Sequence, residues 1–336
     1  MEVMSGNEAK ELQKNVKRGG FRRFVNSSEF GIVVALVAIC VVMSFASPYF
    51  MTSANIFNVL QQMSQITIVS VGMALVILTG GIDLSIGYTL GFSGCVLAVL
   101  LSGGMNMFAV FFIVIALGML IGCANGLLIT RLGIAPFIVT LGTGYVLRGA
   151  QLLISGGRAV TFDSPISFLG GGYVGQLPFS VIIMFIVVIV GVIFSTRTLT
   201  GRNIYAVGNN ERAAELSGIN TKNLKLLVYV IQAALAALCG IVAAGKLHAA
   251  DSQLGSGFEM DVIAAVVIGG FSMAGGEGKM WSVLVGSAII GLIKNAFVLL
   301  GVTSYWQTAM IGIVILVAVS IAPIKNIINN RRKEVV

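Results

Sequence analysis

Long apolar runs, separated by short stretches that carry the charges and most of the prolines, follow one another from about residue 30 to near the end of the chain. The ten runs that can be distinguished cover residues 30–46, 58–79, 87–101, 107–130, 136–155, 179–195, 224–245, 260–275, 281–301 and 306–323. A helix needs about 20 apolar residues to cross a bilayer. The pattern therefore predicts an all-α polytopic membrane protein with about ten transmembrane helices and both termini on the same side.

Glycine placement adds detail to this pattern. The runs at 87–101 and 260–275 are short and glycine-rich, which is typical of helices that are broken or buried behind others. Gly118, Gly122 and Gly126 form two consecutive GxxxG steps, which predict close helix packing. Asn125 and Asn295, each followed by apolar residues and then Leu-Gly, mark two segments that would cross the membrane in opposite directions, so inverted repeats are possible.

Composition agrees with a membrane location, because 57% of the 336 residues are hydrophobic and only 10% are charged. Soluble domains are about a quarter charged. A soluble enzyme, a nucleic-acid binder and a secreted disulfide scaffold are thereby excluded. The four cysteines lie inside apolar runs and never reach CxxC spacing, and His248 is the single histidine. A histidine-based metal site or serine triad is not expected.

The positions of the basic residues predict the orientation. In the ten-helix arrangement, 17 of the 21 Lys and Arg residues fall on the side of the termini, whereas Arg158 and Lys246 fall on the other side. Because basic residues collect in cytoplasmic loops, both termini are predicted to be cytoplasmic. The chain then divides into a basic tail at 1–29, a permease domain at 30–324 and a second basic tail at 325–336.

The longest connection on this cytoplasmic side covers residues 197–225. Asn210 is a suitable N-cap for a short helix at 211–217, whose first residue is Glu211, and Gly218 can end it. A short charged helix between two spans suits a docking element. The alternative is a solvated connector.

Two glycine-containing stretches resemble nucleotide-binding motifs but do not indicate a nucleotide site. Gly170, Gly172 and Gly175 match a dinucleotide fingerprint by letter, but no strand precedes them and no helix is expected to follow. Gly278-Lys279 resembles the end of a Walker A motif, with Met280 where Ser or Thr is required. No segment is long enough to form an ATPase domain, so any ATP must be hydrolysed by another chain.

Four stretches together carry a family resemblance. They are LTGGIDLSIG at 78–87, GLLITRLGIAPFIVTLGT at 126–143, the loop at 197–225, and GFEMDVIAAVVIGGFSMAGGEG at 257–278. In this order, and with GVTSYWQ near the end, the chain resembles the permeases of bacterial monosaccharide ABC importers, above all the ribose permease family. The likeness covers nearly everything after residue 50.

The resemblance implies a type II importer-like bundle in the bacterial inner membrane. Two permease chains, with a homodimer expected, would form the path in the lipid bilayer. An extracytoplasmic binding protein would deliver the sugar, and a cytoplasmic ABC ATPase would use the ATP, so that this chain binds no cofactor itself and has no nucleic-acid partner. The residues that would contact or respond to the ATPase are Arg202, Tyr205, Asn210, Glu211, Arg212, Glu215, Gly218 and Asp83.

Polar residues inside the spans are candidates for the substrate path, because an uncharged sugar needs hydrogen-bond partners. The candidates are Gln61, Gln62, Gln65, Asn125, Thr140, Thr143, Arg148, Gln151 and Lys294. Gln61 and Gln65 lie one turn apart on one helix face. Hydrogen bonding between helices is the alternative for each residue. Arg148 can also extend outward to the headgroups, whereas Lys294 in mid-span requires a partner or water.

Three acidic residues near helix ends have simpler interpretations. Asp83 is placed to cap the helix at 87–101, with a conformational role near the docking loop as the alternative implied by the resemblance. Glu259 and Asp261 begin the run at 260–275 and would stabilise its helix dipole or contact a binding protein.

The sequence thus favours the non-enzymatic permease subunit of a sugar ABC importer. The alternative is an ion-coupled secondary transporter of a small polar solute, which usually needs a carboxylate in mid-membrane. The pattern places Asp83 and Asp261 at helix ends, so this alternative is disfavoured. An intramembrane enzyme would need clustered acids or histidines, which the sequence lacks.

Overall fold

The structure is a computed structural model that describes residues 28–303, 305–307, 309–310, 312–313, 316 and 320. The expected tails at 1–29 and 325–336 therefore lie almost entirely outside the described residues. The last predicted span, 306–323, is only partly described.

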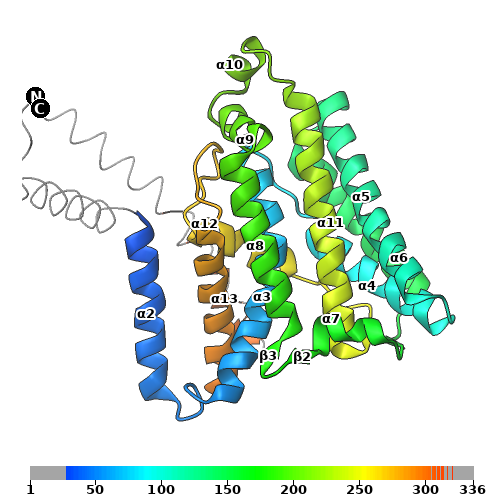
Figure 1. Cartoon of the computed structure of the whole chain (residues 1–336), viewed down its shortest axis with the longest axis vertical. Helices are drawn as coiled ribbons and strands as arrows, with labels where there is room; N and C mark the ends of the chain where they lie inside the picture. Colours follow the sequence, from blue (N-terminus) through cyan, green and yellow to red (C-terminus); the bar gives the residue numbers. More distant parts are fainter. Residues whose placement is uncertain are drawn as a thin grey trace, which may run out of the picture.

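Helices account for most of the described chain. In order they are α2 (Ser28–Ala46), α3 (Ser53–Leu78), α4 (Ile86–Ser102), α5 (Met107–Leu132), α6 (Pro136–Ser155), α7 (Phe168–Gly171), α8 (Phe179–Arg197), α9 (Leu199–Asn209), α10 (Glu211–Leu216), α11 (Thr221–Leu247), α12 (Phe258–Ile268) and α13 (Ser282–Leu299), with a 3₁₀ turn at Pro165–Ser167. Figure 1 shows the long helices standing side by side, with α9 and α10 at one end.

Two short antiparallel pairs lie at the opposite end of the bundle from α9 and α10. β1 (Val160–Thr161) pairs with β4 (Ala249–Ala250), and β2 (Tyr173–Val174) pairs with β3 (Leu177–Pro178). The first pair joins the segment after α6 to the segment after α11, so it ties together two connections that are 90 residues apart in the chain.

Six described helices are long and apolar enough to cross a membrane, namely α3, α5, α6, α8, α11 and α13. Two further apolar helices, at Phe30–Ala46 and Ile86–Ser102, are shorter. The helix ends follow from local sequence. Pro136 occupies the first turn of α6, where its missing N–H costs nothing, and the Asn106 side chain accepts hydrogen bonds from the first turn of α5.

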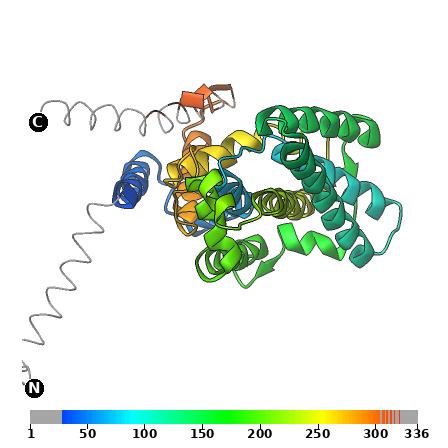
Figure 2. The same cartoon turned by 90° about the horizontal axis from the view of Figure 1, so that it is seen from above.

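Helix α11 is the centre of the bundle and contacts α3, α4 and α5. Seen from above in Figure 2, α2 lies at one edge and α5 and α6 lie toward the opposite edge. The predicted GxxxG packing is confirmed, because α5 meets α11 through its glycines. A Cβ on Gly118 would lie 2.5 Å from the Ala237 Cβ, and one on Gly122 would lie 2.4 Å from the Tyr229 carbonyl oxygen.

Two predicted elements are wrong in extent. The run at 260–275 yields only the 11-residue helix α12, which ends at Ile268 because Gly269 and Gly270 start an irregular, glycine-rich loop. In the loop at 197–225, α10 was expected but the preceding helix α9 was not. Its sequence, LTGRNIYAVGN, is mixed in polarity and contains two glycines. Helix α9 forms because packing against the bundle end buries Ile204 and Val207.

Candidate docking surface and polar clusters

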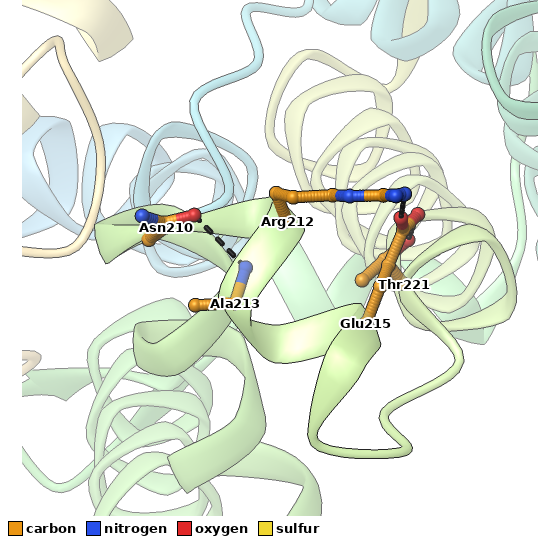
Figure 3. A network of polar contacts seen from close by, with 5 residues as sticks. All are labelled: Asn210, Arg212, Ala213, Glu215 and Thr221. Carbon is orange, nitrogen blue, oxygen red and sulfur yellow. Dashed lines mark hydrogen bonds and ion pairs between the residues drawn. The ribbon is translucent and has the colours of Figure 1, made fainter.

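Helices α9 and α10 are each fixed by a side-chain N-cap. The Thr198 hydroxyl accepts a hydrogen bond from the Gly201 backbone N at 2.9 Å. The Asn210 side chain accepts one from the Ala213 backbone N, also at 2.9 Å (Figure 3). Gly218 has a φ of 84°, the left-handed conformation that ends a helix. The predicted cap and terminator are therefore confirmed, and α10 is one residue shorter than expected.

Polar contacts attach α10 to the start of α11. Glu215 accepts a hydrogen bond from the Thr221 hydroxyl at 3.0 Å and lies 3.5 Å from Arg212 (Figure 3). Glu211 forms an ion pair with Lys225 at 2.7 Å. Both acidic residues are exposed, and their contacts connect α10 to the first turns of α11.

Helix α9 is seated on the end of the bundle through very close contacts. A Cβ on Gly208 would lie 1.8 Å from the Leu78 carbonyl oxygen, so no larger residue fits there. The Tyr205 hydroxyl donates to the Gly278 carbonyl at 3.0 Å. Partial burial of Tyr205 raises the pKa of its hydroxyl, so it stays protonated and remains a donor at neutral pH. Helix α9 therefore touches both the end of α3 and the loop between α12 and α13.

The outward side of this pair of helices is a mixed apolar and basic surface. It consists of Leu199, Arg202, Arg212 and Leu216, and we call it the docking surface. Exposed leucines beside unburied arginines suit a protein partner with an acidic groove.

A second group of polar residues lies inside the bundle and joins three helices. The Ser85 hydroxyl donates to Asp83 at 2.6 Å, Asn125 donates to Ser85 at 3.0 Å, and Thr143 donates to Asn125 at 2.6 Å. Asn125 lies seven residues before the end of α5 and Thr143 seven residues after the start of α6. At 1.5 Å per residue, this chain lies about 10 Å inside the bundle from those helix ends.

This arrangement changes the interpretation of Asp83. The N-cap residue of α4 is Ser85, and the Asp83 side chain accepts a hydrogen bond from the Ser85 backbone N at 2.8 Å, so Asp83 satisfies an N–H group beside the helix start without being the N-cap residue itself. The connection from α3 enters the bundle before α4 begins, as Figure 1 shows. Asp83 is fully buried and bonds Ser85, which links it to the path candidates Asn125 and Thr143.

Gln151 and Arg148 lie one turn apart on α6, further toward the β1–β4 end. The Gln151 amide donates to the carbonyls of Asp251 and Leu254, at 2.8 and 3.2 Å. Those two residues belong to the connection between α11 and α12, which packs against α4 at this level. One guanidinium nitrogen of Arg148 is buried without a hydrogen-bond partner among the described residues.

The other path candidates are not part of this cluster. Gln61 donates to the Gly170 carbonyl at 3.0 Å and so fastens α3 to α7. Thr140 bonds back to Pro136 within its own helix. Gln62 and Gln65 are half-buried on α3. The glutamine group expected on α3 therefore does not meet Asn125 and Thr143 in this conformation.

Lys294 forms a partly buried ion pair with Asp261, which supplies the partner that a charge in mid-span requires. Beside it, Asn295 exchanges two amide hydrogen bonds with Asn55, at 2.7 and 3.1 Å. Asp261 lies in the first turn of α12, as predicted, but its side chain is buried against α13. Because α12 starts only after the α11–α12 connection has entered the bundle, its first turn meets the interior of α13.

Sequence reasoning did not single out Ser85, which belongs to the interior cluster. It also did not predict that Glu259 packs against α4. A Cβ on Gly87 would lie 2.3 Å from Glu259 Oε2, so this carboxylate rests on the first turn of α4. The available signal was the glycine spacing Gly87, Gly91 and Gly94, which indicates a face of α4 that another backbone approaches closely.

The fold and these sites define a class: a multi-pass helical membrane protein with a docking surface at one end and a polar interior. Residues 55–319 match the family described as "Branched-chain amino acid transport system / permease component", and the chain belongs to this family of membrane permeases. No solved structure matches the chain.

Three relatives show how far the similarity extends. The ribose import permease protein RbsC of Escherichia coli (strain K12) is 40% identical over 292 residues, covering 85% of this chain and 91% of the relative. RbsC of Bacillus subtilis (strain 168) is 36% identical over 315 residues, covering 93% and 97%. The D-allose transport system permease protein AlsC of E. coli (strain K12) is 38% identical over 298 residues, covering 87% and 91%. The resemblance found in the sequence is thereby confirmed.

Proposed function

We propose that this chain is the permease subunit of an ABC importer that moves a monosaccharide of the ribose or allose type across the cell membrane. The observation that carries this function is the extent of the similarity, since the ribose import permease of E. coli is 40% identical over 85% of the chain. The docking surface supports the same function, because a permease without an ATPase domain needs a place for a separate ATPase to act.

The mechanism assigns a role to each site. A cytoplasmic ABC ATPase binds the docking surface and moves α9 and α10 when it closes on ATP. Helix α9 passes this movement to α3 through Gly208 and to the α12–α13 loop through Tyr205. The bundle then exposes its polar interior to one side of the membrane and afterwards to the other. An extracytoplasmic binding protein delivers the sugar, and this chain holds no nucleotide.

The finer architecture belongs to the same proposal. The permease has ten transmembrane helices in a type II importer-like bundle, with both termini in the cytoplasm, and it works as a homodimer. Support for an inverted internal repeat comes from two similar transitions: α3 leads through an irregular segment inside the bundle to the short helix α4, and α11 leads likewise to the short helix α12.

One observation favours the alternative, an ion-coupled secondary transporter. Asp83 and Asp261 lie at helix ends, as the sequence pattern predicted, but both side chains are buried in the bundle. Buried carboxylates are a common feature of proton-coupled and sodium-coupled transporters.

Reconstitution in vesicles separates the two functions. We expect the chain with its ATPase and binding protein to accumulate radiolabelled D-ribose or D-allose only when ATP is supplied. We expect the chain alone to move neither sugar under a proton or sodium gradient. Gradient-driven uptake by the lone chain would contradict the importer function and support the secondary transporter.

A further inference from the structure

The first half of α4 is surrounded by four side chains that each keep a buried polar atom unpaired within the described part of the chain. These atoms are Asp83 Oδ2, Arg148 Nη1, Gln151 Oε1 and Glu259 Oε2. Buried polar atoms in native proteins nearly always have a hydrogen-bond partner, so four exceptions around one helix require an explanation. Each atom is left free to bond something that the chain itself does not supply.

Contacts with the α4 glycines place two of these groups, Glu259 and Gln151, one above the other along α4. Glu259 Oε2 is 2.3 Å from where a Cβ on Gly87 would lie, and Gln151 Oε1 is 2.9 Å from the corresponding position on Gly91. Gly87 and Gly91 are one helical turn apart, a rise of about 6 Å. Arg148 lies three residues before Gln151 and hence on the same side of α6.

Two helix N-termini meet at the same place. The backbone N of Glu259 is 3.4 Å from the Cβ position of Gly87, so the first turn of α12 touches the first turn of α4. The N-cap residues, Ser85 and Gly257, make no side-chain capping bond. The partial positive charge at both helix ends stabilises a nearby carboxylate. Both carboxyl groups thus lie next to helix N-termini, where each unpaired oxygen can take part in a hydrogen bond with a ligand hydroxyl.

We propose that these four side chains form the intramembrane contact site for an uncharged polyhydroxylated ligand. This inference rests on the proposed function and names where the sugar would bind. Each sugar hydroxyl can donate to one of the three unpaired acceptors, while Arg148 donates to a sugar oxygen. The two carboxylates disfavour an anion. No group of three potential metal ligands occurs in the described chain, which gives no support to a metal ion.

Isosteric amides test the site, because they alter the unpaired oxygen and keep the shape. In Asp83→Asn the oxygen that accepts from Ser85 can be retained. In Glu259→Gln the contact with Gly87 can be retained. Both variants are reconstituted as the complete complex, and the amounts of D-ribose delivered and of ATP hydrolysed are measured together. Asp163→Asn, an acid-to-amide change in the exposed segment after β1, is the matched control.

We expect at least a fivefold fall in D-ribose delivered per ATP hydrolysed for both variants, with ATP hydrolysis within twofold of the wild type. A weakened site returns the sugar to the binding protein while the ATPase continues to cycle. The Asp163→Asn ratio should equal that of the wild type.

Two results would contradict the proposed contact site for the sugar. One is an unchanged ratio in both variants. The other is a proportional loss of delivery and hydrolysis, which indicates a purely structural role. A wild-type complex that delivers neither D-ribose nor D-allose overturns the proposed function as well, so the two failures are distinguishable.

Discussion

Arg212 and Lys294 are both basic residues with an acidic partner, but their environments give the two ion pairs different meanings. The Arg212 side chain is 80% exposed and lies 3.5 Å from Glu215, whereas Lys294, itself 31% exposed, pairs with an Asp261 side chain that is only 7% exposed, so the cost of a buried pair is an upper bound for it. Exposed ion pairs contribute about 0–1 kcal/mol to stability. Removing one partner of a buried pair costs about 3–5 kcal/mol. Arg212 is therefore available for a partner protein, and Lys294 is needed by the fold.

The docking surface predicts a loss of coupling without a loss of folding. We expect Arg212→Ala and Gly218→Ala to reduce ATP-driven sugar uptake by at least tenfold, with the amount of membrane-inserted chain unchanged. Arg212→Ala removes a contact with the ATPase, and Gly218→Ala strains the left-handed turn that positions α10. Uptake, stimulated ATP hydrolysis and membrane content are measured together.

Gly218→Asn is the control for the second variant, because asparagine tolerates the left-handed conformation and should retain most of the uptake. Normal uptake by both alanine variants would show that the α10 region does not dock the ATPase.

At the scale of elements, glycine decides which helices approach closely. The glycines of α5 meet the backbone of α11, and those of α4 meet the segment that leads into α12. Lipid is as apolar as leucine, so helix association in a membrane depends on such close packing rather than on a hydrophobic drive. The two central contacts of the bundle therefore depend on the smallest side chain.

The α5–α11 contact predicts that Gly122→Leu will destabilise the fold. A Cβ at this position would lie 2.4 Å from a carbonyl oxygen of α11, which cannot move without displacing the helix. Overpacking typically costs about 1–3 kcal/mol. We expect the melting temperature of the detergent-purified chain to fall by at least 5 °C, a shift of the size that such a loss produces.

Gly142→Leu is the matched control, because nothing lies within 4 Å of a Cβ at Gly142 on α6. It should leave the melting temperature within about 2 °C of the wild-type value, a change of no more than about 1 kcal/mol. If both leucine variants melted at the wild-type temperature, the glycine contact would not be important for stability.

At the scale of the whole molecule, the two ends differ in charge and in role. One end carries α9, α10 and Arg131. The Arg131 guanidinium donates a hydrogen bond to the Asn223 side-chain oxygen at 2.8 Å. The other carries Arg158, Lys246 and the β1–β4 pair. Basic residues favour the cytoplasmic side, so α9 and α10 should face the cytoplasm, where ATP is present.

Reporter fusions test this orientation. Green fluorescent protein fused after Val336 should fluoresce and alkaline phosphatase fused there should be inactive, because both reporters would lie in the cytoplasm. Alkaline phosphatase inserted after Arg158 should be active, since that loop is expected outside. Active phosphatase at the C-terminus would contradict the orientation and the even number of spans.

The sequence by itself determined the membrane class, the family, most helix positions and the caps of α10, because hydropathy, glycine spacing and capping are local properties. Only the tertiary structure revealed that α4 and α12 begin inside the bundle. It also showed that Asp83 is linked to Asn125 through Ser85 and that Asp261 pairs with Lys294. The physical reason is that the length of an apolar run indicates how many residues can be buried, but not how deep in the bundle its helix begins. That depth depends on contacts between residues that are far apart in the chain.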